Sequence, residues 1–133
     1  MSESLDLVRS IYADWERGVF TPGMEWAHPD IEFVNPDGPE PGAWRGVAEV
    51  RRAFRDFLGA WHGFTIEVEE YRELPDGRVL VLVRHKGRGK TSGIDLAEVG
   101  GGANVLEIRD GEVSRLTAYW YRDNALADLG LEE

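Results

Sequence analysis

The sequence predicts an α+β fold, in which a curved and largely antiparallel sheet carries helices on its concave side. In the N-terminal half, apolar residues recur every three to four positions, which is typical of amphipathic helices. From Phe64 onward the pattern changes to alternation and short apolar runs between turn residues, which is typical of strands joined as hairpins. The 133 residues show no internal repeat and are too few for two independent cores, so we expect residues 1–133 to form one domain.

The helices are predicted from apolar faces and from the residues at their ends. The first covers 4–19, with its apolar side chains on one face. Thr21-Pro22 is typical of an N-cap followed by proline at the first helical position, which predicts a short helix through Trp26. The strongest periodicity predicts a helix over 47–61, and Asp123 is expected to cap a last short helix that ends at Gly130.

Five strands are expected from alternation or from continuous β-formers, at 31–34, 64–69, 78–86, 103–109 and 113–121. A proline- and glycine-rich loop, 35–46, follows the first of them. The apolar run 79–83 predicts a strand covered on both faces, either within one subunit or by a partner. Asp110-Gly111 predicts a hairpin turn between the last two strands.

Composition excludes several classes of function. The formal net charge is −10, and binding to nucleic acids or anionic membranes requires a basic face, so we expect neither partner. Cysteine is absent, which excludes disulfides, thiol nucleophiles and cysteine-ligated zinc. No apolar run is long enough to span a bilayer and the start does not have the form of a signal peptide, so we expect a cytoplasmic protein.

Few motifs indicate catalysis. Gly89-Lys90-Thr91 resembles the end of a P-loop, but it follows a strand without opening a helix and the first glycine of that pattern is missing, so a flexible loop is preferred. The three histidines lack the spacing that zinc requires, so we expect no metal and no cofactor. His28 is expected in a surface turn and His62 at a helix end. Only His85, near the end of a strand at the open mouth of the sheet, is a candidate general base; the alternative is a solvated strand-end histidine.

Six stretches of sequence carry a resemblance to a known family: YADWERG (12–18), HPDIEF (28–33), WRG (44–46), GRGKTSG (87–93), IRDGEV (108–113) and YWYRDNAL (119–126). Together with the order of elements, they resemble the nuclear transport factor 2-like superfamily, specifically its SnoaL-like branch. The resemblance implies a cone-shaped sheet around one deep, mostly apolar pocket, and often a homodimer through the outer sheet face. It does not imply one reaction, because this fold includes ketosteroid isomerases, polyketide cyclases, dehydratases, epoxide hydrolases and binding modules.

The resemblance to ketosteroid isomerases shows which positions of this chain correspond to their catalytic aspartates, but this chain has other residues at those positions. Where those enzymes have a catalytic aspartate before a proline, this chain has Asn35, and where they have a second, protonated aspartate it has Asn104. Tyr12 lies near the position of their oxyanion-stabilising tyrosine. Asp37 is a possible substitute base, with a solvated turn aspartate as the alternative. The epoxide-hydrolase mechanism is rejected because Ala118 stands where its last-strand aspartate would be.

Alternation in the last strand predicts a pocket wall. Ser114, Leu116, Ala118 and Trp120 share one face, which the family pattern turns inward, and the small Ala118 would leave room for a ligand. The alternative is that Trp120 fills the cone. The expected ligand-binding residues are Tyr12, Trp15, Asn35, Asn104, Leu116, Ala118 and Trp120, with His85 near the rim.

Three functions remain open at this point. The leading hypothesis is binding of a small apolar or polycyclic molecule by a homodimer. The second is an isomerase, cyclase or dehydratase acting on a carbonyl compound, with His85 or Asp37 as the base and with Tyr12 and Asn104 stabilising the enolate. The third is a protein–protein interaction module that uses the outer sheet face at Tyr119 and Tyr121.

Overall fold

The computed structural model describes residues 3–20, 24–38, 41–96 and 101–131. In these residues a six-stranded sheet has the order β2-β1-β6-β5-β4-β3. Every neighbouring pair is antiparallel except β1 and β6, which are parallel. The strands are β1 (Ala27–Asn35), β2 (Gly42–Arg45), β3 (Trp61–Glu73), β4 (Val79–Gly89), β5 (Gly101–Arg109) and β6 (Glu112–Tyr119). The predicted α+β class with a curved, mostly antiparallel sheet is confirmed.

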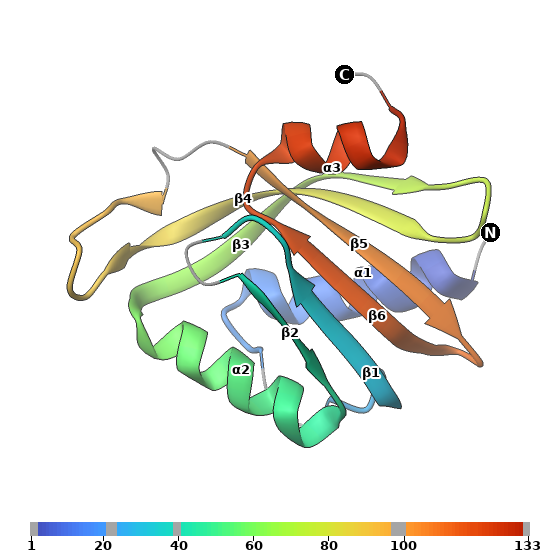
Figure 1. Ribbon diagram of the computed structural model, residues 1–133, viewed down its shortest axis with the longest axis horizontal. Helices are drawn as coiled ribbons and strands as arrows, with labels where there is room; N and C mark the ends of the chain where they lie inside the picture. The colour runs from blue at the N-terminus through green and yellow to red at the C-terminus, as the bar shows by residue number, and fades with distance from the viewer. Residues whose placement is uncertain (1–2, 21–23, 39–40, 97–100, 132–133) are drawn as a thin grey trace.

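Helices cover both faces of this sheet (Figure 1). Helices α1 (Glu3–Glu16) and α2 (Val47–Gly59) lie on one side, and α3 (Arg122–Leu129) lies across the other. Alternate residues of β4 divide between the two sides: Val79, Val81 and Val83 join the core with α1 and α2, whereas Leu80 and Leu82 pack with α3. The predicted two-sided burial of β4 is therefore provided within one chain. No helix in the described ranges is long and apolar enough to cross a membrane.

The predicted short helix near Trp26 is wrong where it can be assessed. Its residues 21–23 lie outside the described residues, and Glu25 and Trp26 form a turn that leads into β1. The sheet takes over the backbone here, because the Trp26 carbonyl accepts the amide hydrogen of Val113 at 2.8 Å. His28 and Pro29 belong to β1 rather than to a turn, and the ladder to β6 is irregular between Ala27 and Glu32, where a proline without an N–H is tolerated.

Two strand boundaries also differ from the prediction. The segment 35–46 was expected to be only a loop, yet its last part forms β2, where Trp44 pairs with and stacks on Phe33 at 5.4 Å between ring centroids. His62 was expected at the end of a helix, but α2 ends at Gly59 and β3 begins at Trp61. This long strand pairs as far as Gly89 of β4, so its ladder sets where the helix stops.

Helix α3 covers the part of the outer sheet face that was expected to be free for partners. Tyr119 is buried beneath it and donates a hydrogen bond to Asp128 at 2.8 Å, while Tyr121 remains exposed. Burial, together with the nearby Asp128 carboxylate, raises the pKa of Tyr119 to about 12. The expectation that Tyr119 contacts a partner is therefore wrong, because its own helix occupies that position. The expected homodimer stays a prediction.

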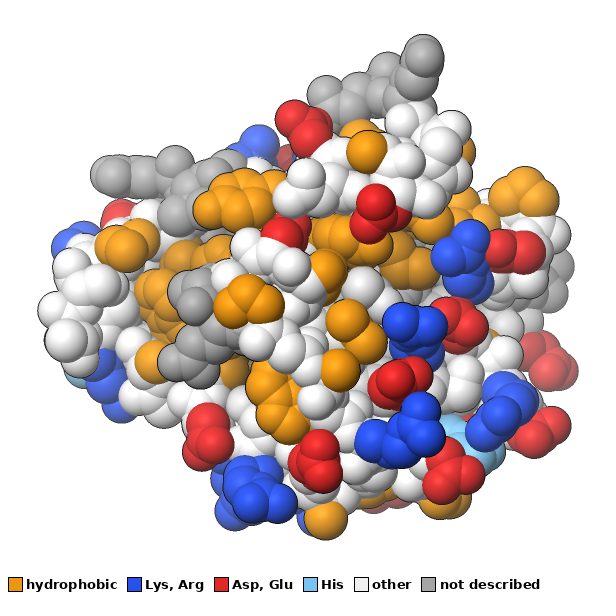
Figure 2. All heavy atoms as spheres, viewed as in Figure 1, with side chains coloured by type: hydrophobic (Ala, Val, Ile, Leu, Met, Phe, Trp, Pro, Cys, Tyr) orange, Lys and Arg blue, Asp and Glu red, His pale blue; other side chains and the backbone are white. Residues whose placement is uncertain are grey.

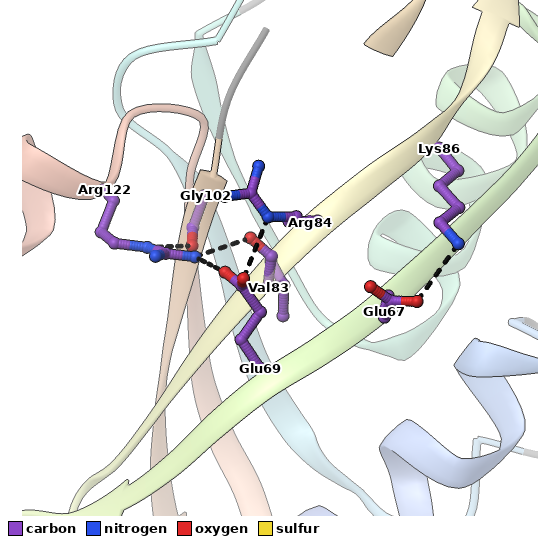
Figure 3. A network of polar contacts seen from close by, with 7 residues as sticks. All are labelled: Glu67, Glu69, Val83, Arg84, Lys86, Gly102 and Arg122. Carbon is purple, nitrogen blue, oxygen red and sulfur yellow. Dashed lines mark hydrogen bonds and ion pairs between the residues drawn. The ribbon is translucent and has the colours of Figure 1, made fainter. Parts of the chain in front are cut away.

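Arg122, the first residue of α3, fastens this helix to the sheet (Figure 3). Its guanidinium donates to the carbonyl oxygens of Val83 at 3.1 Å and Gly102 at 3.4 Å, and forms an ion pair with Glu69. Arg84 pairs with the same carboxylate at 2.9 Å. Three neighbouring strands, β3, β4 and β5, are thus joined to the start of α3 by one side chain.

Candidate functional site

A cavity of about 600 Å³ lies against the inner face of the sheet beside α2. Figure 2 shows hydrophobic side chains in a hollow at the left of the molecule, where Figure 1 places α2 and the end of β4. Nine phenylalanine and tryptophan side chains line it: Trp15, Phe20, Phe33, Trp44, Phe54, Phe57, Trp61, Phe64 and Trp120. No lysine or arginine lines it in the described part of the chain. The cavity therefore suits an apolar molecule without negative charge.

Three residues of the last strand region line this cavity as their alternation predicted: Leu116, Ala118 and Trp120. Trp120 does not fill it, since the indole lies against the wall, with ring centroids 5.9 Å from Phe57 and 5.9 Å from Trp61. Ser114 is absent from the lining, and its hydroxyl instead donates to the Glu107 carbonyl. The alternation fails there because the β5–β6 register shifts next to Glu107.

Tyr12 and Asn104 come together at the cavity wall from α1 and β5. The Asn104 amide donates to the Tyr12 hydroxyl oxygen at 2.6 Å. Tyr12 is completely buried and does not line the cavity, and burial raises the pKa of its phenol far above the ordinary value, so it remains neutral. Asn104 does line the cavity, and only 3% of it is exposed.

The second amide atom of Asn104, Oδ1, has no hydrogen-bond partner among the described residues. A buried polar atom without a hydrogen-bond partner lowers the stability of a folded protein by about 1–3 kcal/mol. Because a tyrosine hydroxyl both donates and accepts, the amide can bind Tyr12 through either end and offer either its oxygen or its N–H₂ group to the cavity. Asn104 thus offers a ligand a polar group on the cavity wall.

His85 also lines the cavity, and it is buried rather than solvated, with 9% of it exposed. The centroid of its imidazole lies 5.8 Å from that of the Phe64 ring and 5.3 Å from that of the Trp120 ring. Burial lowers the pKa of the ring to about 4, so it is neutral near pH 7. Gly102 leaves room for the His85 ring, because a Cβ at position 102 would lie only 2.6 Å from His85 Cε1.

Asp37 and Asn35 line the cavity but hold the structure around it. Asp37 accepts the amide hydrogens of Trp120 at 2.7 Å and Tyr121 at 3.3 Å, and the side chain of Asn124 at 2.9 Å. Asn35 Oδ1 accepts the amide hydrogen of Gly38 at 3.0 Å. Three N–H groups converge on its carboxylate, so Asp37 is not a freely solvated turn aspartate, and its role as a base stays a prediction.

The sequence reasoning missed part of the aromatic wall. Phe57 was assigned to one helix face and Phe64 to a strand, with no role at the site, whereas Trp61 was one of five tryptophans assigned mostly to the core, with a wide apolar pocket as the alternative. In the structure Phe57 and Phe64 meet edge to face at 5.0 Å, and all three line the cavity. Trp15, in contrast, was predicted to bind the ligand, and it lies in the lining, with its ring centroid 6.0 Å from that of Phe54. The signal available was the unusual number of tryptophans.

Comparison with known protein families shows to which family the chain belongs. The model of the SnoaL-like domain matches residues 8–116. The chain belongs to the SnoaL-like domain family. No curated protein matches it. Within the described residues of this SnoaL-like domain, no group of three or more histidine and acidic side chains could hold a metal ion.

Solved structures share the fold of this SnoaL-like domain at low sequence identity. An NTF2-like protein from Burkholderia thailandensis is 22% identical, with 100% of both chains covered and a TM-score of 0.74. A candidate isomerase from Bacillus subtilis is 18% identical, with 99% of this chain and 98% of that chain covered and a TM-score of 0.72. TerC, co-crystallised with polyporic acid, is 21% identical, with 96% and 98% covered and a TM-score of 0.72. These likenesses establish the fold alone.

Proposed function

We propose that this SnoaL-like domain binds a small, uncharged and largely apolar molecule in its cavity, through a polar group that meets Asn104. The observation that carries the proposal is the Asn104 amide, which is buried in the cavity wall and has one atom without a partner among the residues that the structure describes. A ligand carbonyl, hydroxyl or N–H group placed there would form the missing hydrogen bond and so offset the free energy lost by leaving that atom without a partner.

The rest of the wall supports the same ligand class. Aromatic side chains supply apolar contact area worth about 25 cal/mol for each Å² of ligand surface removed from water. Carboxylates and phosphates would enter without a cationic partner, because no lysine or arginine lines the cavity in the described ranges. A structural neighbour, TerC, was co-crystallised with a small molecule, polyporic acid, which is compatible with this use of the fold.

Calorimetric titration with 2-naphthol and 2-naphthoate tests this proposal. The two probes share a ring system, but only the second carries a charge at neutral pH. We expect 2-naphthol to bind at least about tenfold more tightly, and Asn104→Leu to weaken it several-fold. Lys86→Gln, on the outer sheet face, is the control variant and should leave both affinities unchanged. Failure of 2-naphthol to bind, or tighter binding of the carboxylate, would contradict the proposal.

A second candidate function is proton transfer on a carbonyl compound, as in an isomerase, cyclase or dehydratase. The observation that favours it is the neutral imidazole of His85 on the cavity wall, which can accept a proton. Asn104 would then stabilise the enolate oxygen. Turnover of an enone, lost below about pH 4 and abolished in His85→Ala, would support this function. Ligand binding without turnover across enones, epoxides and polyketides would exclude it.

A further inference from the structure

The segment that follows β4 lies at the mouth of the cavity. Five of its residues line the cavity: Gly89, Thr91, Ser92, Ile94 and Leu96. Figure 1 shows this segment projecting from the end of β4, on the same side of the molecule as the end of α2. Its two ends are held in place, because Gly89 pairs with Trp61 in the β3–β4 ladder and only 1% of Leu96 is exposed. We call residues 90–95, which lie between these two ends, the flap.

The flap makes its backbone hydrogen bonds mainly with its own base. The Gly93 amide donates to the Gly89 carbonyl oxygen at 3.0 Å, and the Gly89 amide donates to that of Ile94 at 2.9 Å. Gly93 closes this turn with a φ of 70°, which glycine adopts without strain. Among the described residues, one backbone hydrogen bond joins the flap to another part of the chain, from the Lys90 amide to the Ala60 carbonyl oxygen at 3.0 Å. Rotation of the flap about its two ends therefore requires the loss of that one backbone hydrogen bond.

Two half-exposed apolar side chains mark the mouth. In the described residues the large hydrophobic side chains that remain exposed are Val19, Ile94 and Tyr121. Ile94 and Tyr121 are 50% and 52% exposed, yet both line the cavity, whereas Val19 does not. Ile94 belongs to the flap, whereas Tyr121 directly precedes α3 and is held by the Asp37 carboxylate, which accepts its amide hydrogen at 3.3 Å. The mouth therefore has one apolar side chain on the flap and another on a fixed part of the fold.

We infer that the flap closes over a ligand in the cavity and brings the Ile94 side chain against the ring of Tyr121. This inference rests on the proposed binding function and adds a conformational step to it. A bound apolar molecule supplies a surface on which both side chains can pack, and removing all three surfaces from water favours the closed arrangement. Without a ligand, the same movement would enclose a void whose lining lacks packing contacts. Closure is therefore coupled to binding, because only the ligand makes the closed arrangement favourable.

Stopped-flow measurements of 2-naphthol dissociation, followed by tryptophan fluorescence, test the closing contact. Ile94→Ser and Tyr121→Ser should each raise the dissociation rate about threefold to tenfold. The double variant should raise it by clearly less than the product of the two factors, because either change alone removes the contact between the two side chains. Val19→Ser is the matched control: this third exposed hydrophobic side chain lies outside the cavity lining, so its loss should leave the rate unchanged. Factors that multiply would show that each side chain contacts the ligand alone and would overturn the inference.

A cross-link tests the movement itself, since the chain has no cysteine of its own. In the variant Ile94→Cys/Tyr121→Cys a disulfide forms when the two Cα atoms come within about 7 Å of each other. We expect saturating 2-naphthol to accelerate its formation in a glutathione redox buffer at least about threefold, as followed by mass spectrometry. The oxidised variant should then release 2-naphthol at least about tenfold more slowly than the same variant after reduction. Val19→Cys/Tyr121→Cys is the control pair, and 2-naphthol should not accelerate its oxidation.

The outcomes separate closure of the flap from binding in the cavity. A rate of disulfide formation that is equal with and without 2-naphthol overturns the inference, while calorimetric binding of 2-naphthol leaves the proposed function standing. No binding of 2-naphthol to the unmodified protein overturns both. If the double cysteine variant does not fold, as judged by circular dichroism, the serine variants still decide whether the flap closes.

Discussion

The carboxylate of Asp37 accepts the amide hydrogen of Trp120 at 2.7 Å, although the two residues are 83 positions apart in the chain. Gly38, next to Asp37, lies so close to the same indole that a Cβ there would collide with it. The loop after β1 therefore holds the aromatic wall of the cavity and the start of α3 in place. The residue that the sequence offered as a substitute base is used as a structural acceptor.

We expect Asp37→Ala to destabilise the protein by about 1–3 kcal/mol, because it leaves the buried amide of Trp120 without its acceptor. Asp56 is the matched control, since it is a second carboxylate at the cavity, and Asp56→Ala should change the free energy of unfolding by less than about 0.5 kcal/mol. Urea unfolding measures both. Unchanged stability in Asp37→Ala, accompanied by loss of a catalytic rate, would instead restore the role of Asp37 as a base.

Burial of His85 predicts a pH-dependent stability. Its pKa is about 4 in the folded protein, against 6.5 for an ordinary histidine. Between these pH values the unfolded chain therefore binds a proton that the folded protein does not. The stabilising contribution is complete above about pH 6.5 and is lost progressively as the pH falls towards 4, in total about 3 kcal/mol. His85→Phe should flatten this part of the curve in unfolding experiments between pH 7 and pH 4. A curve of the same slope in the variant would place the dependence on other groups.

The sequence predicted those parts of the site that depend on local periodicity. Alternation placed Leu116 and Ala118 on the cavity wall, and it failed at Ser114, where a register shift that no local pattern reveals turns the strand. Phe57 lies in α2 as predicted, but its place at the cavity was missed; Trp61 was assigned to the same helix because its spacing continues the helical period, although α2 ends at Gly59. Apolar periodicity indicates which residues are buried but not whether they face a core or a cavity.

Long-range polar contacts could not be predicted from local pattern at all. The acceptor role of Asp37 depends on Trp120, and the burial of His85 depends on Phe64 from another strand and on a glycine in β5. That Tyr12 and Asn104, 92 positions apart, would lie at one site was anticipated only through the resemblance to a family, and their hydrogen bond to each other was not anticipated. These contacts are created when the sheet closes around the helices, so they belong to the tertiary structure alone.

The Tyr12–Asn104 pair should show strong energetic coupling. Tyr12→Phe removes the hydroxyl and leaves two amide atoms of Asn104 without partners, and Asn104→Leu leaves the Tyr12 hydroxyl alone. Each single change should cost about 1–3 kcal/mol, whereas the double variant should cost clearly less than the sum, because an apolar pair leaves nothing unsatisfied. A double-mutant cycle from urea unfolding measures the coupling. Additive losses would show that the hydrogen bond contributes little.

Arg122 provides a test of how α3 is attached, because its side chain is 20% exposed and touches three strands. Arg122→Gln should lower the free energy of unfolding by about 1–3 kcal/mol, since the carbonyl oxygens of Val83 and Gly102 lose a charged donor. Lys86→Gln is the matched control: the Lys86–Glu67 pair lies on the same face but both partners are more than half exposed, so its loss should cost less than about 0.5 kcal/mol.

The ion pair between Arg122 and Glu69 should also make the stability of the protein depend on pH. The hydrogen bond from Arg122, and then the one from Arg84, lower the pKa of Glu69 below its usual 4.5. A carboxyl whose pKa is lowered by folding stabilises the protein above the pKa of the unfolded chain, and this contribution is lost as the pH falls below about 4.5. Arg122→Gln should therefore weaken the acid sensitivity below the pH range in which His85 acts. Equal acid sensitivity in Arg122→Gln and the unmodified protein would mean that Arg84 alone holds the Glu69 carboxylate.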